Sequence, residues 1–168
     1  MIQSGKELEF ETRNDLPGAV RSDMVGMLNA LLADASDLAS QLKQAHWNVK
    51  GPSFIALHKL FDDIVDDVRE YGDELAERAV SLGGIALGTV RMAAERSTLV
   101  EYPADISAGS DHVRATSDAL ATFGAHVRES IKIAEEAGDA DTADLCTEIS
   151  RGIDKWLWFV EAHGQAEA

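Results

Sequence analysis

The sequence predicts an all-α protein, a bundle of four long helices with a long connection between the second helix and the third. Apolar residues recur at intervals of three and four in four long stretches, which is the period of a helix with one buried face. The chain contains only three prolines, at positions 17, 52 and 103, and all fall outside these stretches. No stretch of useful length alternates with the period of a strand.

The first two helices are separated by a Gly-Pro pair. We expect the first helix to begin at Ser22, a residue that can cap a helix, and to end near Lys50, because residues 51–52 cannot continue it. The second should begin at Ser53 and end before the two glycines at 83–84. The side chains expected to face the core are Met24, Met27, Leu28, Leu31, Ala35, Leu38 and Leu42, then Phe54, Leu57, Phe61, Ile64, Val68 and Leu75.

The second half of the chain contains a long connection and two further helices. The connection spans 83–108, with a candidate short helix at 90–95, and connections of this length usually carry structure or function. A third helix should run from about Ser110 to the Gly-Asp pair at 138–139, and a fourth from about 141 to 164. Their inward side chains should be Val113, Leu120, Phe123, Val127, Ile131 and Ala134, then Leu145, Ile149, Ile153, Trp156 and Val160.

The length of 168 residues suits one domain, which we place at 21–164 between an N-terminal tail (1–20) and a C-terminal tail (165–168). The single cysteine, Cys146, excludes an internal disulfide and a cysteine-rich zinc site, and we expect it in the core. No apolar run approaches the roughly 18 residues of a membrane span. The polar segment 1–15 lacks the apolar core of a signal peptide, so we expect a cytoplasmic protein without membrane contact.

The composition also limits the partners. The chain has 30 acidic residues against 15 Lys and Arg, a formal charge of −15. Generic binders of nucleic acid or of anionic membranes need a basic surface, so this balance argues against both classes.

Two of the five histidines flank the Gly-Pro turn. His46 lies five residues before Gly51 and His58 lies seven after it, so they face each other if the two helices form an antiparallel hairpin. Asp62 follows His58 by one helical turn, on the same face. Two imidazoles and a carboxylate suit iron, zinc or manganese.

A second pair of carboxylates, Asp73 and Glu77, lies further along the same helix. The step from Asp62 to Asp73 is 11 residues, which puts both groups on nearly one side of the helix but about 16 Å apart along its axis. One straight helix cannot close both groups around one metal centre. A second copy packed antiparallel across a two-fold axis can, because Asp73 and Glu77 of one chain then meet His46, His58 and Asp62 of the other.

Structural interpretations of the same residues stay open. A solvated acidic face explains most acidic runs in helices, and a histidine near a helix end is often a packing residue. The chain has no Glu-x-x-His, the usual di-iron signature, which disfavours a di-iron centre within one subunit. A zinc hydrolase is also conceivable, but no nucleophile or oxyanion device accompanies the histidines.

The remaining histidines and tryptophans suggest structural roles. We expect His112 at the surface or at a helix cap and His163 in solvent, while the direction of His126 is undetermined. Trp156 and Trp158 are expected to be packing or interface residues.

A long ordered motif crosses the Gly-Pro turn. It reads Lys43-Gln44-Ala45-His46-Trp47-Asn48-Val49-Lys50-Gly51-Pro52, followed by Phe54, His58, Phe61 and Asp62, then Asp73, Glu77-Arg78, Glu101-Tyr102-Pro103, residues 138–144 and Asp154-Lys155-Trp156-Leu157-Trp158-Phe159. Over roughly residues 14–163 the chain thereby resembles the Dps family, the ferritin-like DNA-binding proteins from starved cells, also called miniferritins.

The resemblance implies a ferritin-like four-helix bundle with a short extra helix in the middle connection, assembled as a hollow dodecamer. It implies a ferroxidase that oxidises Fe(II), preferably with hydrogen peroxide, stores the ferric mineral in the shell and so protects against oxidative damage. The di-iron sites of the family lie at two-fold interfaces. His46, His58 and Asp62 match the iron ligands from one subunit, and Asp73 and Glu77 match those from the other.

Two further assignments concern single residues. Trp47 either packs at an interface or intercepts a stray oxidising equivalent next to His46. In the family, acidic residues at three-fold pores guide iron inward, and the matching segment here offers Asp139, Asp141 and Asp144. Asp141 is equally suited to capping the fourth helix.

Many members of the family bind DNA through a mobile basic tail. Here residues 1–21 hold three basic side chains against four acidic ones, and residues 163–168 hold no Lys or Arg. Because binding by counterion release needs several phosphate contacts, we expect DNA binding to be weak or absent. The alternative function is a DNA-binding, nucleoid-protecting protein with secondary iron chemistry, and a third is a shell without metal chemistry.

Overall fold

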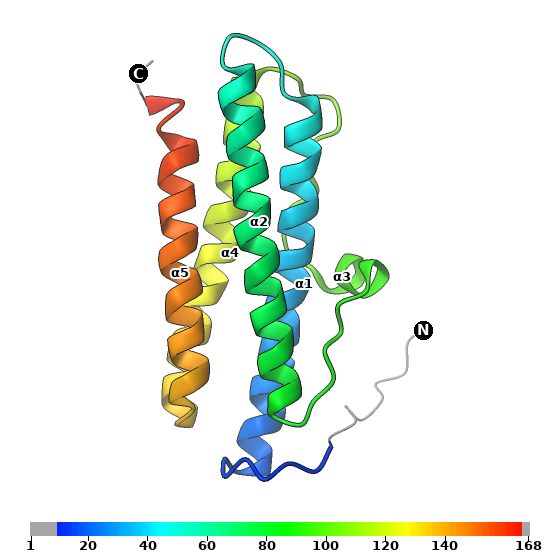
Figure 1. Ribbon diagram of the computed structural model, residues 1–168, viewed down its shortest axis with the longest axis vertical. Coiled ribbons are helices and arrows are strands. Elements are labelled where there is room, and N and C mark those ends of the chain that lie inside the picture. Colours follow the sequence, from blue (N-terminus) through cyan, green and yellow to red (C-terminus); the bar gives the residue numbers. More distant parts are fainter. Residues whose placement is uncertain (1–9, 166–168) are drawn as a thin grey trace.

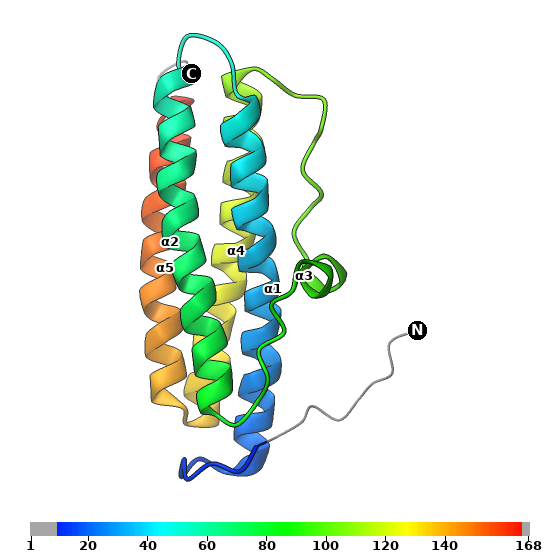
Figure 2. The same ribbon diagram turned by 45° about the vertical axis from the view of Figure 1, so that its right-hand side comes forward.

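The computed structural model describes residues 10–165, and its regular elements in that range are α-helices. The helices are α1 (Gly18–Asn48), α2 (Phe54–Ser81), α3 (Val90–Arg96), α4 (Gly109–Ala137) and α5 (Ala140–Glu161). The four long helices run side by side, and α3 stands beside α1 in the crossover from α2 to α4 (Figure 1; Figure 2). The prediction of a four-helix bundle with a short extra helix in the long connection is confirmed.

The first helix begins one turn earlier than the sequence suggested. It starts at Gly18, and the carbonyl oxygen of Pro17 accepts the amide of Arg21 at 3.0 Å. The N-cap assignment of Ser22 is therefore wrong. Proline, with φ fixed at −53° here, suits the start of a helix because that position needs no amide donor.

The predicted apolar faces meet in one core. Its largest fully buried side chains include Leu28, Leu38, Leu42, Leu57, Phe61, Ile64, Leu75, Leu120, Phe123 and Ile149. Phe54 is an exception at 43% exposed, because it is the first residue of α2, where it only tilts against the ring of His58. Cys146 is buried in the core as predicted, and burial raises the pKa of its thiol to about 11.

Buried polar side chains of α1 hold the crossover in place. The bonds run from Asn29 Nδ2 to Ile85 O (2.9 Å), from Leu87 N to Asn29 Oδ1 (2.8 Å), from Thr98 N to Asp34 Oδ1 (2.7 Å) and from Gln41 Nε2 to Val100 O (3.0 Å). These bonds satisfy backbone amide and carbonyl groups of the crossover, which has little regular secondary structure to pair them. His126 of α4 completes this set by bonding Asp34 Oδ2 through Nδ1 at 2.9 Å.

The position of His112 corrects a second expectation. It is fully buried rather than at the surface, because α4 begins at Gly109 and its first turn is covered by the crossover, where Tyr102 bonds the imidazole. His163, by contrast, is exposed as expected. Among the described residues, no helix combines the length and the hydropathy that crossing a membrane requires.

Candidate metal centre

His46 and His58 meet where α1 ends and α2 begins. Gly51 reverses the chain between them with φ at +109°, a conformation that favours glycine. The two imidazole rings stack with their centroids 3.7 Å apart and their planes 20° from parallel. The sequence prediction that these histidines face each other is therefore confirmed in the geometry of the hairpin.

Each histidine is oriented by the backbone of the other. His46 Nδ1 lies 2.6 Å from the carbonyl oxygen of His58, and His58 Nδ1 lies 2.8 Å from the carbonyl oxygen of His46. A carbonyl oxygen only accepts hydrogen bonds, so each Nδ1 carries the hydrogen and donates it. With the hydrogen on Nδ1, Nε2 is the nitrogen of each ring that can offer a lone pair to a metal.

Asp62 lies one turn after His58, and Lys43 neutralises it. Lys43 Nζ is 2.6 Å from Asp62 Oδ1, and that oxygen is 4.0 Å from His46 Nδ1. The hydrogen bond from Lys43 lowers the pKa of the Asp62 carboxyl against the opposing effect of burial, so the group is ionised at neutral pH. Lys43 stands three residues before His46, on the same side of α1, but the sequence showed no sign of its partner.

The structure does not bring Asp73 and Glu77 to the histidines within one chain. Both are exposed on α2, towards the end of the helix that is remote from the Gly-Pro turn. Asp73 borders a groove of about 370 Å³ between α1 and α2, whose lining includes the small residues Ala35, Ala39, Gly72 and Ala76. Within residues 10–165 of a single chain, no three His, Cys, Asp or Glu side chains form a group that could hold a metal ion.

Trp47 extends into solvent beside the group formed by His46, His58 and Asp62. Its side chain is 66% exposed, which is unusual for tryptophan, and Lys43 Nζ lies 5.7 Å from its ring centroid. The described part of its own chain therefore leaves most of the indole available for a partner.

The three candidate pore residues differ in their surroundings. Asp139 is only 2% exposed and caps α5 by accepting the amide of Thr142 at 3.1 Å, so Asp141 is not the N-cap. Arg78, the residue after Glu77, bonds Asp139 Oδ1 at 2.7 Å and thereby ties the end of α2 to the α4–α5 turn. Asp141 and Asp144 are exposed near this turn.

Comparison with known proteins agrees with the fold. A family model described as the ferritin-like domain matches residues 25–166. The DNA protection during starvation protein of Agrobacterium fabrum is 44% identical over 158 residues, which are 94% of this chain and 98% of that protein.

Two solved structures are also similar. A Mycobacterium smegmatis Dps in a tetragonal form has a TM-score of 0.87 at 33% identity, covering 91% of this chain and 93% of that one. DpsC from Streptomyces coelicolor has a TM-score of 0.89 at 27% identity, covering 97% and 95%. The helical architecture and the family match define a protein of the ferritin-like class. Within that class, the chain belongs to the Dps family.

Proposed function

We propose that this protein oxidises ferrous iron at sites shared between two subunits and stores the ferric product inside a dodecameric shell. The observation that carries the proposal is the reciprocal bonding of His46 and His58, which leaves both Nε2 lone pairs free. In this proposal Asp62 adds a carboxylate from the same chain, and Asp73 and Glu77 of a second chain complete the site.

The donor set suits the chemistry. Neutral imidazoles and carboxylates bind iron in both oxidation states, and an incomplete coordination shell leaves room for an oxidant. Hydrogen peroxide is the preferred oxidant in this proposal. Two ferrous ions each give up one electron, and the peroxide takes up both electrons with two protons to form two water molecules. Paired oxidation therefore releases no hydroxyl radical, which would protect the cell from oxidative damage.

The surface of the α1–α2 hairpin supports a second copy at this place. Small side chains line the groove beside Asp73 and would let another hairpin approach closely. Trp47 and Ile55 are exposed near the turn and would become buried there. An antiparallel arrangement removes the separation of about 16 Å between Asp62 and Asp73, because each site then uses groups from opposite ends of two α2 helices.

Iron entry is assigned to the acidic start of α5. Asp141 and Asp144 are exposed and would attract cations at a three-fold pore, whereas Asp139 holds the turn in shape through Arg78. The formal charge of −15 per chain favours the entry of cations in a shell of many copies.

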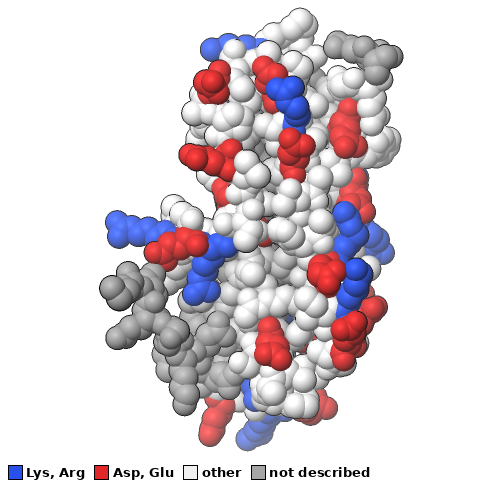
Figure 3. All heavy atoms as spheres, turned by 180° about the vertical axis from the view of Figure 1, so that it is seen from behind, with Lys and Arg blue, Asp and Glu red and all other residues white. Residues whose placement is uncertain are grey.

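Protection of DNA by direct binding is the alternative, because the Agrobacterium fabrum relative is named for DNA protection. The charges of this chain favour iron oxidation and storage over direct DNA binding. On the face seen in Figure 3, acidic and basic side chains are interspersed and form no continuous basic patch. We therefore propose that protection by this protein is chemical and that its DNA binding is weak or absent.

A complementation experiment tests the shared site. His58→Ala and Asp73→Ala chains, carrying different tags, would be produced separately and together, and co-assembled shells would be purified through both tags. If the two variants pair at random, half of the two-fold pairs contain one chain of each variant. In such a mixed pair one of the two sites has all of its residues intact. About a quarter of the wild-type rate should therefore return. Each variant alone should be inactive although its shell has the normal size. Mixed shells as inactive as the single variants would exclude a shared site.

A further inference from the structure

Tyr102 and His112 form a hydrogen-bonded pair outside the candidate metal centre, in which the histidine is buried and the tyrosine is half-buried. Tyr102 belongs to the crossover and His112 to the first turn of α4, and the tyrosine oxygen lies 2.5 Å from His112 Nδ1. The two rings are 20° from parallel, with centroids 6.0 Å apart. The imidazole is fully buried, and its Nε2 makes no hydrogen bond of good geometry with any described residue.

The protonation states of the pair follow from burial. Burial lowers the pKa of His112, and the Asn48 backbone and Asp111 only partly offset this effect, so the imidazole is neutral at pH 7. Burial raises the pKa of Tyr102, so the phenol keeps its proton. The Tyr102 hydroxyl therefore donates its hydrogen to the lone pair of His112 Nδ1. This nitrogen is a base that can accept the phenolic proton.

A pocket connects the pair with Trp47, which stands beside the candidate metal centre. Tyr102 and Trp47 line the same pocket of about 660 Å³ between α1 and the crossover, with Gln44 and Glu101 also in its wall. Trp47 directly follows His46 in α1. An oxidising equivalent that left the proposed site through Trp47 would face Tyr102 across this pocket.

The other tyrosine of the chain lacks these features. Tyr71 lies against Gly152, and burial together with Asp67, Glu74, Glu148 and Glu70 raises its pKa to about 12. Among the described residues, no imidazole or carboxylate is hydrogen-bonded to the Tyr71 hydroxyl, so no base is held in place to receive its proton.

We propose that Tyr102 and His112 are a redox-active pair that quenches one-electron oxidants formed when peroxide meets a site holding a single ferrous ion. The source of the oxidant rests on the proposed ferroxidase function. Tyr102 gives one electron to a hydroxyl radical, which becomes hydroxide, while the phenolic O–H bond breaks and the proton moves to His112 Nδ1. A later ferrous ion returns the electron and becomes ferric, and the proton moves back to the phenoxyl oxygen.

The first arm of the test uses metal-free wild-type shells and a photo-oxidised ruthenium polypyridyl complex as the one-electron oxidant. Samples frozen after the flash should show a tyrosyl radical by electron paramagnetic resonance. Tyr102→Phe should reduce that signal at least fivefold, and the matched control Tyr71→Phe should keep it.

His112→Gln keeps a hydrogen-bond acceptor but removes the base, so it should reduce the radical yield. In wild-type protein, whose fold is not in question, radical formation should slow in D₂O because the proton moves with the electron. A signal that survives Tyr102→Phe, or a rate that is unchanged in D₂O, would overturn the pair whether or not the protein oxidises iron.

The second arm replaces the photo-oxidant with substoichiometric ferrous iron followed by hydrogen peroxide. The same radical should form and then decay on addition of more ferrous iron. Wild-type protein that oxidises iron without forming the Tyr102 radical would overturn the quenching role. A failure to oxidise iron at all would count against the proposed function, while the photochemical arm would still decide on the pair.

Discussion

His46 and His58 each donate the hydrogen of Nδ1 to the backbone carbonyl oxygen of the other, at 2.6 and 2.8 Å. The two bonds cross the Gly-Pro turn and fix both ring planes, which explains the stacking at 3.7 Å. Because the backbone of each residue orients the ring of the other, the α1–α2 turn itself would be part of the proposed metal centre. Lys43, Asp62 and Trp47 are then arranged around two imidazoles that are already in place.

We expect Lys43 to compete with a metal ion for Asp62. Lys43→Met removes the cation that bonds Asp62 Oδ1, so binding of a divalent metal should become tighter. Since such partly exposed ion pairs are worth up to about 1 kcal/mol, the affinity for Co²⁺ should rise by up to about fivefold. Titration followed by the visible absorbance of Co²⁺ measures this effect.

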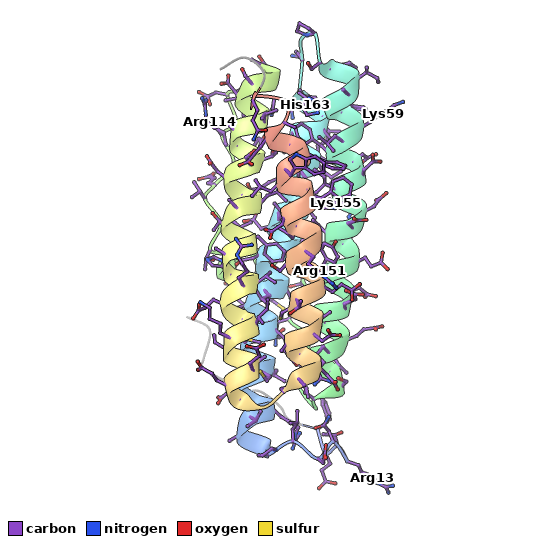
Figure 4. The ribbon with its side chains drawn as sticks, turned by 90° about the vertical axis from the view of Figure 1, so that its left-hand side faces the viewer. Arg13, Lys59, Arg114, Arg151, Lys155 and His163 are labelled. Carbon is purple, nitrogen blue, oxygen red and sulfur yellow. The ribbon has the colours of Figure 1, made fainter. Side chains whose placement is uncertain are left out.

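The matched control for Lys43 is Lys59→Met. Lys59 lies on α2 and points away from the bundle (Figure 4), so its loss should leave the affinity unchanged. An equal or weaker affinity in Lys43→Met would show that Lys43 is a neutral bystander or a helper in metal binding.

Arg78 stabilises the turn that leads into α5. Arg78→Ala leaves the buried carboxylate of Asp139 without its cation, and removal of one partner from a buried pair costs about 3 kcal/mol or more. The melting temperature should fall by several degrees in calorimetry. Arg114→Ala is the control, because Arg114 is 72% exposed in its pair with Asp111 (Figure 4) and should change stability little. Equal effects of the two substitutions would refute the structural role of Arg78.

Glu74 makes stability depend on pH. Burial and the neighbouring carboxylates of Glu148 and Glu70 raise the pKa of Glu74 above its ordinary value of 4.5. Its ionisation therefore costs more in the folded state than in the unfolded state, and stability is lost as pH rises through the raised pKa. Glu74→Gln should raise the melting temperature at pH 7 and leave it unchanged near pH 4.

The control for Glu74 is Glu136→Gln on α4, an exposed position where removal of the charge should have a small effect at either pH. If Glu74→Gln lowered the melting temperature at pH 7, the ionised carboxylate would be stabilising and the cause assigned to its shift would be wrong.

DNA binding should be weak or absent. The negative charge of the chain and the scarcity of basic residues in its terminal segments leave few cations for phosphate contacts. Duplex DNA should keep its mobility in a gel with micromolar shells at neutral pH without divalent cations. A chain with a lysine-rich tail added after residue 168 provides the positive control. Retardation of DNA by the unmodified shell would revive direct binding as its means of protection.

Features that follow from the helical period could be predicted from the sequence. Contacts made by long polar side chains could not. Apolar spacing located the four helices and the facing of His46 and His58, because both follow from an antiparallel hairpin. The start of α1 was misplaced because Pro17 begins the helix without a side-chain cap. The partners of Lys43 and Arg78 could not be inferred, since each long side chain reaches another helix or turn. That Asp73 and Glu77 complete a metal site with the histidines of a second subunit stays a prediction.

The measurement that tests the central claim most directly is anaerobic. Ferrous iron is added to the purified protein, then hydrogen peroxide, while ferric absorbance and trapping of hydroxyl radical are followed together. A His46→Ala, Asp73→Ala double variant with an intact shell is treated in the same way. Fast oxidation with little radical in the wild type, lost in the variant, is the result we predict. Equally slow oxidation and equal radical yield in both would contradict a ferroxidase centre built from these residues.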